Sequence, residues 1–418
     1  MKKMIIRGGR PLSGEVKISG FKNAALPLLY ASILTADISL IGNVPRILDV
    51  FRTLEILESM GATARFVDSG TVLCDTRFVR PCASPDSLVR KLRASSYLMG
   101  AELARFGRTR AAIPGGCSIG RRPLDIHLFV FRALGAKAEE SEEAITATAP
   151  GGLRGGEVVL EKPSVGATVN AILAAVGAGG ETVLRGAARE PHIADLCAYL
   201  SACGAIIAGV GSDCLRIRGG RPLHGASYAL MPDMIEAGTF LCACGAAGGN
   251  VTLRGAKAEH LTVLLKTLRD MGMEIHTAPQ TITATRPGEL APFSLLAEPY
   301  PGFPTDMHPQ FAALATGIPG ESRIRETVFP DRFRYVEELR RLGAEMTVQN
   351  GEVIITGGKP LRPGCVVATD LRAGAAEVIA ALGVTGETVI RDAGILERGY
   401  DALPGKLRAL GVPVMIGS

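Results

Sequence analysis

A glycine-rich segment, residues 113–123, carries the side chain best suited to covalent chemistry in this sequence. It reads IPGGCSIGRRP, so Cys117 is followed closely by Arg121 and Arg122. A thiol beside two guanidinium groups is expected to have a lowered pKa, and the thiolate is the nucleophilic form. Glycine and proline at this density suit neither a helix nor a central strand, so we predict an exposed, mobile loop. Cys117 is therefore predicted to be the most reactive of the nine cysteines; an incidental cysteine in a glycine turn is the alternative.

Polar residues also recur at six points where a strand-like run meets an alanine-rich helical run. Helix N-termini carry unpaired N–H groups and a partial positive charge, and therefore bind anions. If the six helix ends face one region, they line a cleft that contains both cations and carboxylates. Each serine, threonine or aspartate could instead be a simple helix cap, but capping explains the lysine and the arginines poorly. The six junctions are Lys22-Asn23, Arg93-Ala94-Ser95, Ser164 to Ala167, Asp233 with Glu236, Thr305-Asp306, and Asp370-Leu371-Arg372.

A second set of basic residues lies outside these junctions. Taken singly, each is typical of a solvated surface charge; gathered together, they would suit a small acidic substrate. They are Arg121, Arg122, Lys162, Arg332 and Arg398.

The elements that must position these residues are repeated six times. Each helical pattern ends in a glycine that we interpret as a left-handed helix cap, and successive caps are 68 to 74 residues apart: Gly61, Gly135, Gly204, Gly272, Gly343 and Gly411. Near-identical openings stand at residues 8–12, 219–223 and 357–361, with a weaker fourth at 151–153. Similar strand-like runs follow, such as 182–185, 251–254 and 388–391. We therefore predict six α/β units of roughly 60–80 residues, which is too long for solenoid or propeller repeats, divided three and three between two domains with a boundary near 219–232.

Bulk composition agrees with a large protein that has aliphatic cores. The chain has 418 residues, 47% of them hydrophobic but only 5% aromatic, and no tryptophan. That length favours at least two domains. The net charge of +5 is scattered, so nucleic-acid binding gains no support. The nine cysteines form no Cys-x-x-Cys pair, which favours reduced thiols in a reducing compartment.

Several classes of protein lose their main support. The N-terminus lacks a signal peptide, and the longest apolar stretch, 24–41, is interrupted by Pro27 and Asp37, so no membrane span is expected and the chain is expected to be cytoplasmic. His-x-x-x-His pairs, a P-loop and Gly-x-Gly-x-x-Gly are absent, which disfavours metal-dependent, nucleotide-hydrolysing and Rossmann-type enzymes.

Six motifs together resemble the UDP-N-acetylglucosamine 1-carboxyvinyltransferase family from end to end. They are Lys22 to Pro27, Pro114 to Gly120 with Arg122-Pro123, Ser164 to Thr168, Ala188 to Pro191, Phe303 to Met307, and Ala368 to Arg372. The resemblance implies the enolpyruvyl transferase fold, a two-domain inside-out α/β barrel with six repeated units. One domain would span 22–231, and the other would combine 1–21 with 232–418. The active site would lie between them.

The resemblance also implies a reaction. The 3-hydroxyl of UDP-N-acetylglucosamine would add to C2 of phosphoenolpyruvate and phosphate would leave, which is the first committed step of peptidoglycan synthesis. No metal, organic cofactor, nucleic acid, membrane or obligate protein partner is implied. Cys117 would donate a proton to C3, form an adduct with the substrate, and be the target of fosfomycin.

Roles for individual residues follow from the same resemblance. Asp306 would act as the base for the 3-hydroxyl, and Lys22 and Arg398 would share in catalysis. Phosphoenolpyruvate would contact Lys22, Asn23, Arg122, Arg332, Asp370, Arg372 and Arg398, with its phosphate at Lys22, Arg122 and Arg398 and its carboxylate at Arg332 and Arg372. The sugar nucleotide would contact Asn23, Arg93, Arg122, Pro123, Leu124, Asp125, Ile126, Lys162, Ser164, Val165, Gly166, Asp306 and Val328.

Two alternatives remain at this point. A shikimate-phosphate type of enolpyruvyl transferase shares the fold, but the Cys117 loop argues against it. A non-catalytic paralogue that binds a UDP-sugar and regulates a partner would lack some motif residues, and none is missing. One departure is Phe21, which stands where a small residue is usual before Lys22.

Overall fold

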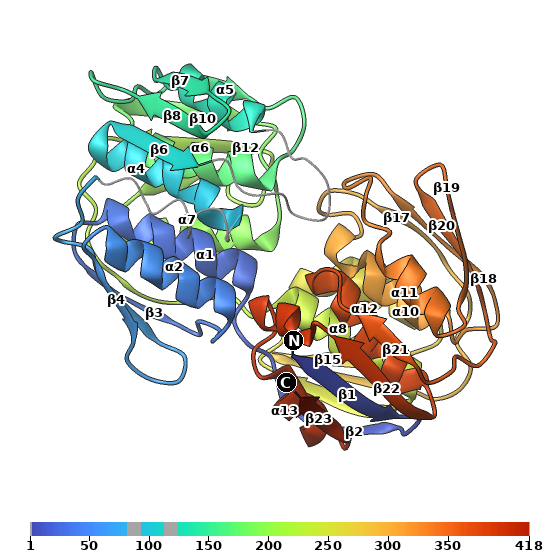
Figure 1. Cartoon of the computed structure of the whole chain (residues 1–418). Coiled ribbons are helices and arrows are strands. Elements are labelled where there is room, and N and C mark those ends of the chain that lie inside the picture. The colour runs from blue at the N-terminus through green and yellow to red at the C-terminus, as the bar shows by residue number, and fades with distance from the viewer. Residues whose placement is uncertain (1, 82–92, 113–123, 418) are drawn as a thin grey trace. The chain divides into compact units, whose positions relative to one another are not determined.

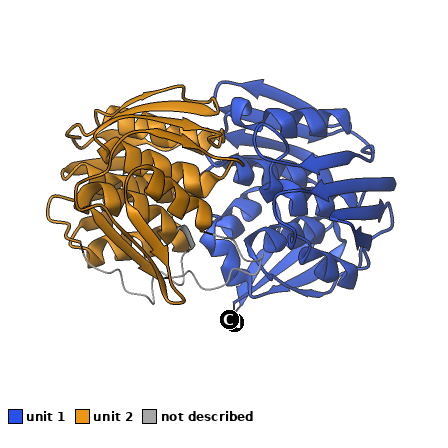
Figure 2. Cartoon of the chain, turned by 90° about the horizontal axis from the view of Figure 1, so that it is seen from above, with its two compact units in different colours: residues 1–19, 118–120, 232–418 blue, residues 20–117, 121–231 orange. Residues whose placement is uncertain are grey.

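The computed structural model describes residues 2–81, 93–112 and 124–417, with only the backbone at Arg93 and Ala94. The chain divides into two compact units, coloured in Figure 2. Unit 1 contains the residues up to Ser19 together with those from Pro232 onward, and unit 2 contains the described residues from Gly20 to Met231. The predicted domain limits, after residues 21 and 231, lie close to these divisions. An active site shared by the two domains stays a prediction.

Unit 2 contains three small sheets among its described residues. Their strand orders are β13-β3-β5-β4, β6-β8-β7 and β11-β12-β10-β9. The elements are α1 (Lys22–Ala31), η1 (Ser32–Leu34), β3 (Ile38–Gly42), α2 (Leu48–Ser59), β4 (Thr63–Phe66), β5 (Val72–Asp75), η2 (Arg93–Tyr97), α4 (Leu98–Phe106), β6 (Arg108–Ala112), α5 (Asp125–Ala133), β7 (Lys137–Glu140), β8 (Ala144–Thr148), β9 (Glu157–Val159), α6 (Val165–Gly177), β10 (Gly180–Arg185), α7 (Pro191–Ala202), β11 (Ile206–Ala208), β12 (Cys214–Gly219) and β13 (Ser227–Ala229).

Unit 1 likewise has three sheets in its described part. Their orders are β21-β22-β1-β23, β15-β16-β14-β2 and β17-β18-β20-β19. The elements are β1 (Lys3–Gly8), β2 (Leu12–Lys17), α8 (Met234–Ala247), β14 (Gly249–Arg254), η3 (Ala258–Leu261), α9 (Thr262–Asp270), β15 (Glu274–Ala278), β16 (Thr281–Arg286), β17 (Ser294–Ala297), η4 (Thr305–Met307), α10 (His308–Ala315), β18 (Gly320–Glu326), α11 (Tyr335–Arg341), β19 (Glu345–Gln349), β20 (Glu352–Gly357), β21 (Cys365–Val367), α12 (Leu371–Gly383), β22 (Gly386–Arg391), η5 (Ala393–Arg398), α13 (Leu403–Ala409) and β23 (Val414–Gly417).

The first strand of the chain is paired with the last part of it. Ile5 of β1 stands opposite Val389 of β22 on one side and Met415 of β23 on the other, both antiparallel. Figure 1 shows this blue strand between the red ones. The chain therefore starts in unit 1, passes through unit 2 and returns.

Helices fill the interior of each unit and the sheets lie outside them. In α8 every residue from Met234 to Gly245 is buried, and in α12 every residue from Arg372 to Leu382. A helix that is hydrophobic all round is a buried one, and the alanine-rich runs make these two helices largely apolar on every side. The outer strands alternate instead, as in the buried-exposed pattern of β18, because one face of each sheet meets solvent.

The six capping glycines are confirmed. They follow α2, α5, α7, α9, α11 and α13, and all have positive φ, from 85° to 108°. Such backbone conformations favour glycine because it has no Cβ. One repeat therefore comprises a buried central helix, a second helix that ends in one of these glycines, and a small sheet.

The double glycines of the repeat openings have a packing role. A Cβ at Gly8, Gly219 or Gly357 would lie only 2.0 to 2.2 Å from a carbonyl oxygen at the end of a central helix. The glycine after each of them has a positive φ and donates its N–H to that helix end, for example Gly9 to Leu382 O at 3.0 Å. The two glycines thus let the end of a strand pack closely against the C-terminus of a central helix and donate a hydrogen bond to it.

The six predicted junctions lie where they were expected, at the start of the central helices. Lys22 begins α1, Arg93 begins the η2 turn before α4, and Val165 begins α6. In unit 1 Asp233 precedes α8, Thr305 begins the η4 turn before α10, and Asp370 precedes α12. Within the described ranges, no helix has both the length and the apolar character to cross a membrane.

Candidate active site

Two arginines hold one carboxylate in unit 1. Nη2 of Arg332 lies 2.5 Å from Oδ1 of Asp306, and Nη2 of Arg372 lies 2.8 Å from Oδ2. Both arginine side chains are almost fully buried, whereas 24% of the Asp306 side-chain surface is exposed. The three residues come from a loop after β18, from α12 and from η4, so they are separated in sequence. The result is a site in which two guanidinium groups grip a single carboxylate.

The two arginines keep the Asp306 carboxyl ionised. Burial by itself would raise the pKa of Asp306, but the charges of Arg372 and Arg332 outweigh it and hold the pKa well below its ordinary range. Arg372 responds in the opposite sense: burial would lower its pKa, and the charge of Asp306 raises it overall. Asp306 is therefore ionised and a very weak base in this arrangement.

Two aspartates near this group cap helices. Oδ1 of Asp370 accepts the N–H groups of Arg372 and Ala373 at 2.9 and 3.0 Å. Oδ1 of Asp233 accepts those of Ile235 and Glu236 at 2.7 and 3.0 Å. Burial raises the pKa of Asp233 to about 7, against the charge of Arg372. The capping alternative therefore holds for both, and Asp370 in addition fixes the first turn that carries Arg372.

Glu236 and Arg398 have different surroundings. The buried Glu236 carboxylate accepts the Ser19 N–H at 2.7 Å and pairs with Lys406 at 2.5 Å, so it forms a structural ion pair. Arg398 ends η5, which packs against α12, and it is partly exposed.

Lys22 of unit 2 also has a carboxylate partner. Its Nζ lies 2.7 Å from Oδ2 of the buried Asp49, and Nη1 of Arg52 lies 3.5 Å from Oδ1 of the same side chain. The lysine keeps 15% of its side-chain surface exposed. Asn23, the next residue of α1, is partly exposed as well.

The predicted sugar-nucleotide residues of unit 2 belong to three segments that one buried side chain joins. Asn170 of α6 donates from Nδ2 to Ser96 O at 3.0 Å and bonds His127 Nδ1 at 2.8 Å. Its Oδ1 accepts the Gly100 N–H at 2.7 Å. Asn170 thereby ties α6 to η2, α4 and α5, the elements at which Arg93, Asp125 and Ser164 stand.

The start of α6 is closely packed and capped. Ser164 accepts the Ala167 N–H at 3.3 Å as the helix cap. A Cβ at Gly166 would lie 2.9 Å from the His127 ring, so only glycine fits there. Leu124, Ile126 and Val165 are partly exposed, and Asp125 and Lys162 are exposed.

Three predicted site residues, Cys117, Arg122 and Pro123, lie outside the described residues, as does the Arg93 side chain. Among the described cysteines five are buried, and burial raises the pKa of Cys74 and Cys197 to about 12 each. Cys365, by contrast, is exposed in β21. Of the described cysteines, Cys365 is thus the one most open to solvent.

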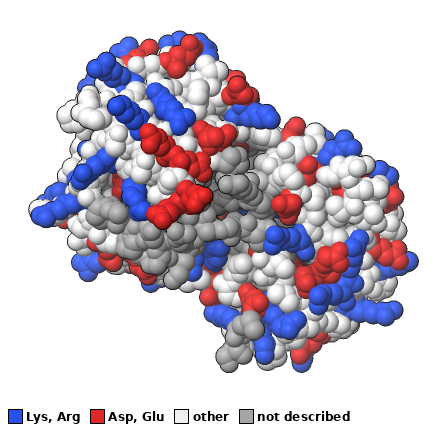
Figure 3. All heavy atoms as spheres, turned by 45° about the horizontal axis from the view of Figure 1, so that its top comes forward, with Lys and Arg blue, Asp and Glu red and all other residues white. Residues whose placement is uncertain are grey.

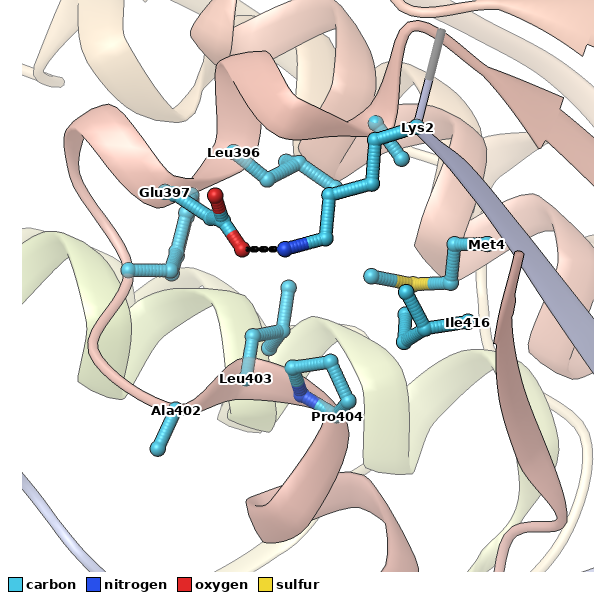
Figure 4. A pocket seen from close by; sticks show the side chains of 10 residues that line it. Lys2, Met4, Leu396, Glu397, Ala402, Leu403, Pro404 and Ile416 are labelled. Carbon is cyan, nitrogen blue, oxygen red and sulfur yellow. Dashed lines mark hydrogen bonds and ion pairs between the residues drawn. The ribbon is translucent and has the colours of Figure 1, made fainter. Parts of the chain in front are cut away.

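Surface charge and small hollows add little to the site. Figure 3 shows basic and acidic side chains intermixed over the visible face of each unit. A pocket of about 50 Å³ in unit 1 is lined by Met4, Leu396, Leu403 and Ile416, with the Lys2–Glu397 ion pair across it (Figure 4). Ligand pockets usually have several hundred Å³, so this hollow is too small for a nucleotide sugar.

Sequence patterns missed several residues of these clusters. Glu326, His308 and Tyr335 form a buried network beside Arg332, and Asp49 and Asn170 are buried polar side chains in unit 2. A polar residue on an otherwise apolar helix was the available signal for Asn170. Arg332, which taken singly is typical of a solvated surface charge, is buried.

Comparisons with known proteins agree with this geometry. The family model of EPSP synthase (3-phosphoshikimate 1-carboxyvinyltransferase) matches residues 6–407. The solved enolpyruvyl transferase NikO from Streptomyces tendae superposes with a TM-score of 0.90 at 28% identity, covering 100% of this chain and 99% of its own. The fold is thus that of the enolpyruvyl transferases, which confirms the predicted inside-out α/β barrel.

More similar sequences define the branch of that class. The UDP-N-acetylglucosamine 1-carboxyvinyltransferase of Finegoldia magna is 41% identical over 99% of this chain and 98% of its own length. The UDP-N-acetylglucosamine 1-carboxyvinyltransferase 2 of Carboxydothermus hydrogenoformans is 44% identical over 99% of both. The chain belongs to the UDP-N-acetylglucosamine 1-carboxyvinyltransferase family.

Proposed function

We propose that this chain transfers the enolpyruvyl group of phosphoenolpyruvate to the 3-hydroxyl of UDP-N-acetylglucosamine. Relatives with that name match it over almost its whole length at 41 to 44% identity. The observation that carries the proposal is the pair of buried arginines around one carboxylate, because phosphoenolpyruvate brings a carboxylate of the same geometry.

In the addition step the sugar oxygen bonds to C2 of phosphoenolpyruvate while a proton goes to C3. In the elimination step phosphate leaves C2 and a proton leaves C3, which restores the double bond. Cys117 donates the proton to C3, and Asp306 accepts the proton of the 3-hydroxyl. Each proton transfer by a positioned side chain contributes about 10²–10⁴ to the rate. These steps need no metal or organic cofactor.

The charges of phosphoenolpyruvate match the basic residues. Arg332 and Arg372 take the carboxylate, since a guanidinium binds a carboxylate through two parallel hydrogen bonds. Lys22, Arg122 and Arg398 take the phosphate, with Asn23 and the Asp370-capped end of α12 beside it.

The sugar nucleotide would occupy the remaining residues. In unit 2 these are Asn23, Arg93, residues 122–126, Lys162 and residues 164–166, and in unit 1 they are Asp306 and Val328. Asn170 holds the unit 2 part of this set in place, because its side chain joins α6 to η2, α4 and α5.

Asp306 must change partners during the reaction. In this structure the Asp306 carboxylate pairs with both guanidinium groups that we assign to the substrate carboxylate, and its pKa is low for that reason. Once phosphoenolpyruvate takes over Arg332 and Arg372, Asp306 loses two positive partners and becomes a stronger base. The base is thereby activated once phosphoenolpyruvate is bound.

The sugar acceptor separates this proposal from its rival. The matching family model carries the name of a shikimate-phosphate enzyme, whereas the relatives at 41 to 44% identity are named for the UDP-sugar. The Cys117 loop also favours the UDP-sugar as the acceptor. We further propose that the enzyme acts in the cytoplasm and supplies peptidoglycan synthesis.

The decisive experiment measures inorganic phosphate. The purified chain should release it from phosphoenolpyruvate with UDP-N-acetylglucosamine, and not with shikimate 3-phosphate or with phosphoenolpyruvate alone. Release with shikimate 3-phosphate would support the rival, and no release with either acceptor would support a regulatory paralogue.

A further inference from the structure

Glu326, the last residue of β18, has its carboxylate completely occupied. Oε1 accepts the N–H groups of Val328 and Phe329 at 2.7 and 3.0 Å. Oε2 accepts the Thr305 hydroxyl at 2.8 Å and the Nδ1–H of His308 at 3.0 Å. The side chain has no exposed surface. Four donors on one buried carboxylate make a rigid junction, because every lone-pair direction is used.

This junction joins two segments that carry proposed substrate ligands. Thr305 and His308 belong to the η4–α10 segment around Asp306, while Val328 and Phe329 belong to the loop that leads to Arg332. Each segment is bound to a different oxygen of Glu326. The carboxylate therefore sets the separation of the two segments.

Thr305 connects Glu326 to Arg332 through its hydroxyl. Its hydroxyl donates to Glu326, and the same oxygen accepts from Nε of Arg332 at 3.2 Å. Nη2 of Arg332 is held separately by Asp306. Since Asp306 is proposed to leave when substrate arrives, Thr305 is then the remaining described hydrogen-bond partner of the guanidinium.

His308, one of the four donors to Glu326, is itself held in place. The Tyr335 hydroxyl lies 2.8 Å from Nε2 of His308, and both residues are buried. Burial lowers the pKa of His308, although Glu326 opposes this, while the hydrogen bond from His308 helps to hold the pKa of Glu326 below its ordinary value against burial. The anionic carboxylate thus fixes the histidine tautomer with its proton on Nδ1.

We propose that Glu326 is a positioning residue which, through Thr305, aims Arg332 at the carboxylate of phosphoenolpyruvate. This inference rests on the proposed function, because it assigns that carboxylate to Arg332. It adds Glu326, Thr305 and His308 to the machinery as groups that act on the substrate through the arginine.

The test compares Thr305→Val with Thr305→Ser. Valine has the same shape but neither donates to Glu326 nor accepts from Arg332, whereas serine keeps the hydroxyl. Thr305→Val should raise the KM for phosphoenolpyruvate about tenfold, since hydrogen bonds that involve ions are roughly twice as strong as neutral ones. The KM for UDP-N-acetylglucosamine and the kcat should change less than about twofold, the pattern of lost uniform binding. Thr305→Ser should restore the parent value.

Two further variants complete the design. Thr267→Val removes a hydroxyl bonded to Val263 O within α9 of the same unit, and it should leave both KM values unchanged. Glu326→Gln keeps a carbonyl oxygen for the two backbone N–H groups and removes the charge, so it should also raise the KM for phosphoenolpyruvate selectively. It serves in place of Thr305→Val if that variant does not fold.

The outcomes separate the inference from the function beneath it. If the parent protein releases no phosphate, the proposed function fails. If the parent is active but Thr305→Val keeps its KM for phosphoenolpyruvate, loses affinity mainly for the sugar nucleotide, or is not rescued by serine, the positioning role is overturned and the function stands.

Discussion

Replacing Asp306 by asparagine should tighten the binding of phosphoenolpyruvate while it abolishes turnover. Asparagine has nearly the same shape and removes the charge that holds Arg332 and Arg372 at 2.5 and 2.8 Å. In the parent protein the substrate carboxylate must displace that charge. In the variant it meets two guanidinium groups that a neutral amide holds only weakly.

The expected gain follows from the contacts. A hydrogen bond to a charged group contributes about 1.5–3 kcal/mol to stability, and Asp306 makes two of them. In the variant the substrate carboxylate still forms its hydrogen bonds to Arg332 and Arg372. It no longer has to displace the charged Asp306 carboxylate from them, only a neutral amide. A gain equal to one such bond corresponds to a dissociation constant roughly 10 to 100 times lower, because about 1.4 kcal/mol is a factor of ten.

Isothermal titration calorimetry with phosphoenolpyruvate and without the sugar nucleotide measures this directly, since no enolpyruvyl transfer can then take place. Asp331→Asn is the matched control: Asp331 is exposed and precedes Arg332 in the sequence, so its loss changes the net charge equally. It should leave the dissociation constant within about twofold of the parent. Equal or weaker binding by Asp306→Asn would refute the exchange of carboxylates and with it the activation of the base.

Three other predictions concern stability, the nucleotide site and the thiol. Among the described residues the buried Glu377 carboxyl has no hydrogen-bond partner, and burial, together with the charges of Glu338 and Asp370, raises its pKa to about 10. It is neutral when folded and ionised when unfolded above about pH 4.5, so stability falls as pH rises from there toward 10; Glu377→Gln should add up to about 3 kcal/mol at pH 7 and nothing below pH 4.5. Thermal unfolding at both pH values checks this, and stabilisation that persists at pH 4 would contradict it. Asn170→Ala should raise the KM for UDP-N-acetylglucosamine about tenfold through lost positioning, with the KM for phosphoenolpyruvate within twofold; steady-state kinetics decide, and equal effects on both would count against a local role. Cys117 should be the thiol that fosfomycin alkylates, and phosphoenolpyruvate should protect it; peptide mass spectrometry showing the label on the exposed Cys365 instead would sink that assignment.

Much of the architecture could be predicted because it depends on local rules that recur. A glycine after a helix marks a left-handed cap in any context, so Gly61 and its five counterparts marked the helix ends. Alanine-rich runs indicated helices where α8 and α12 are found. The position of Lys22, Asp233 and Asp370 at helix starts followed from the same patterns.

The partners of the charged side chains could not be predicted, because they come from distant parts of the chain. Asp306 and Arg372 are 66 residues apart, and the pattern around Arg332 was that of a surface charge. The Tyr335–His308–Glu326 network has separations of 27 and 18 residues, and histidine spacing gave no sign of it.

The repeat, the helix ends and the family motifs could be recognised without coordinates, since these are encoded within a few neighbouring residues or by direct similarity. Which charged side chains pair with one another depends on the folded chain. It placed Asp306 between two arginines and so turned a candidate base into a weak one, and it made Glu326 a buried junction. The physical reason is that pKa values and hydrogen-bond partners depend on burial and on charges within a few ångströms, and packing alone brings those groups together.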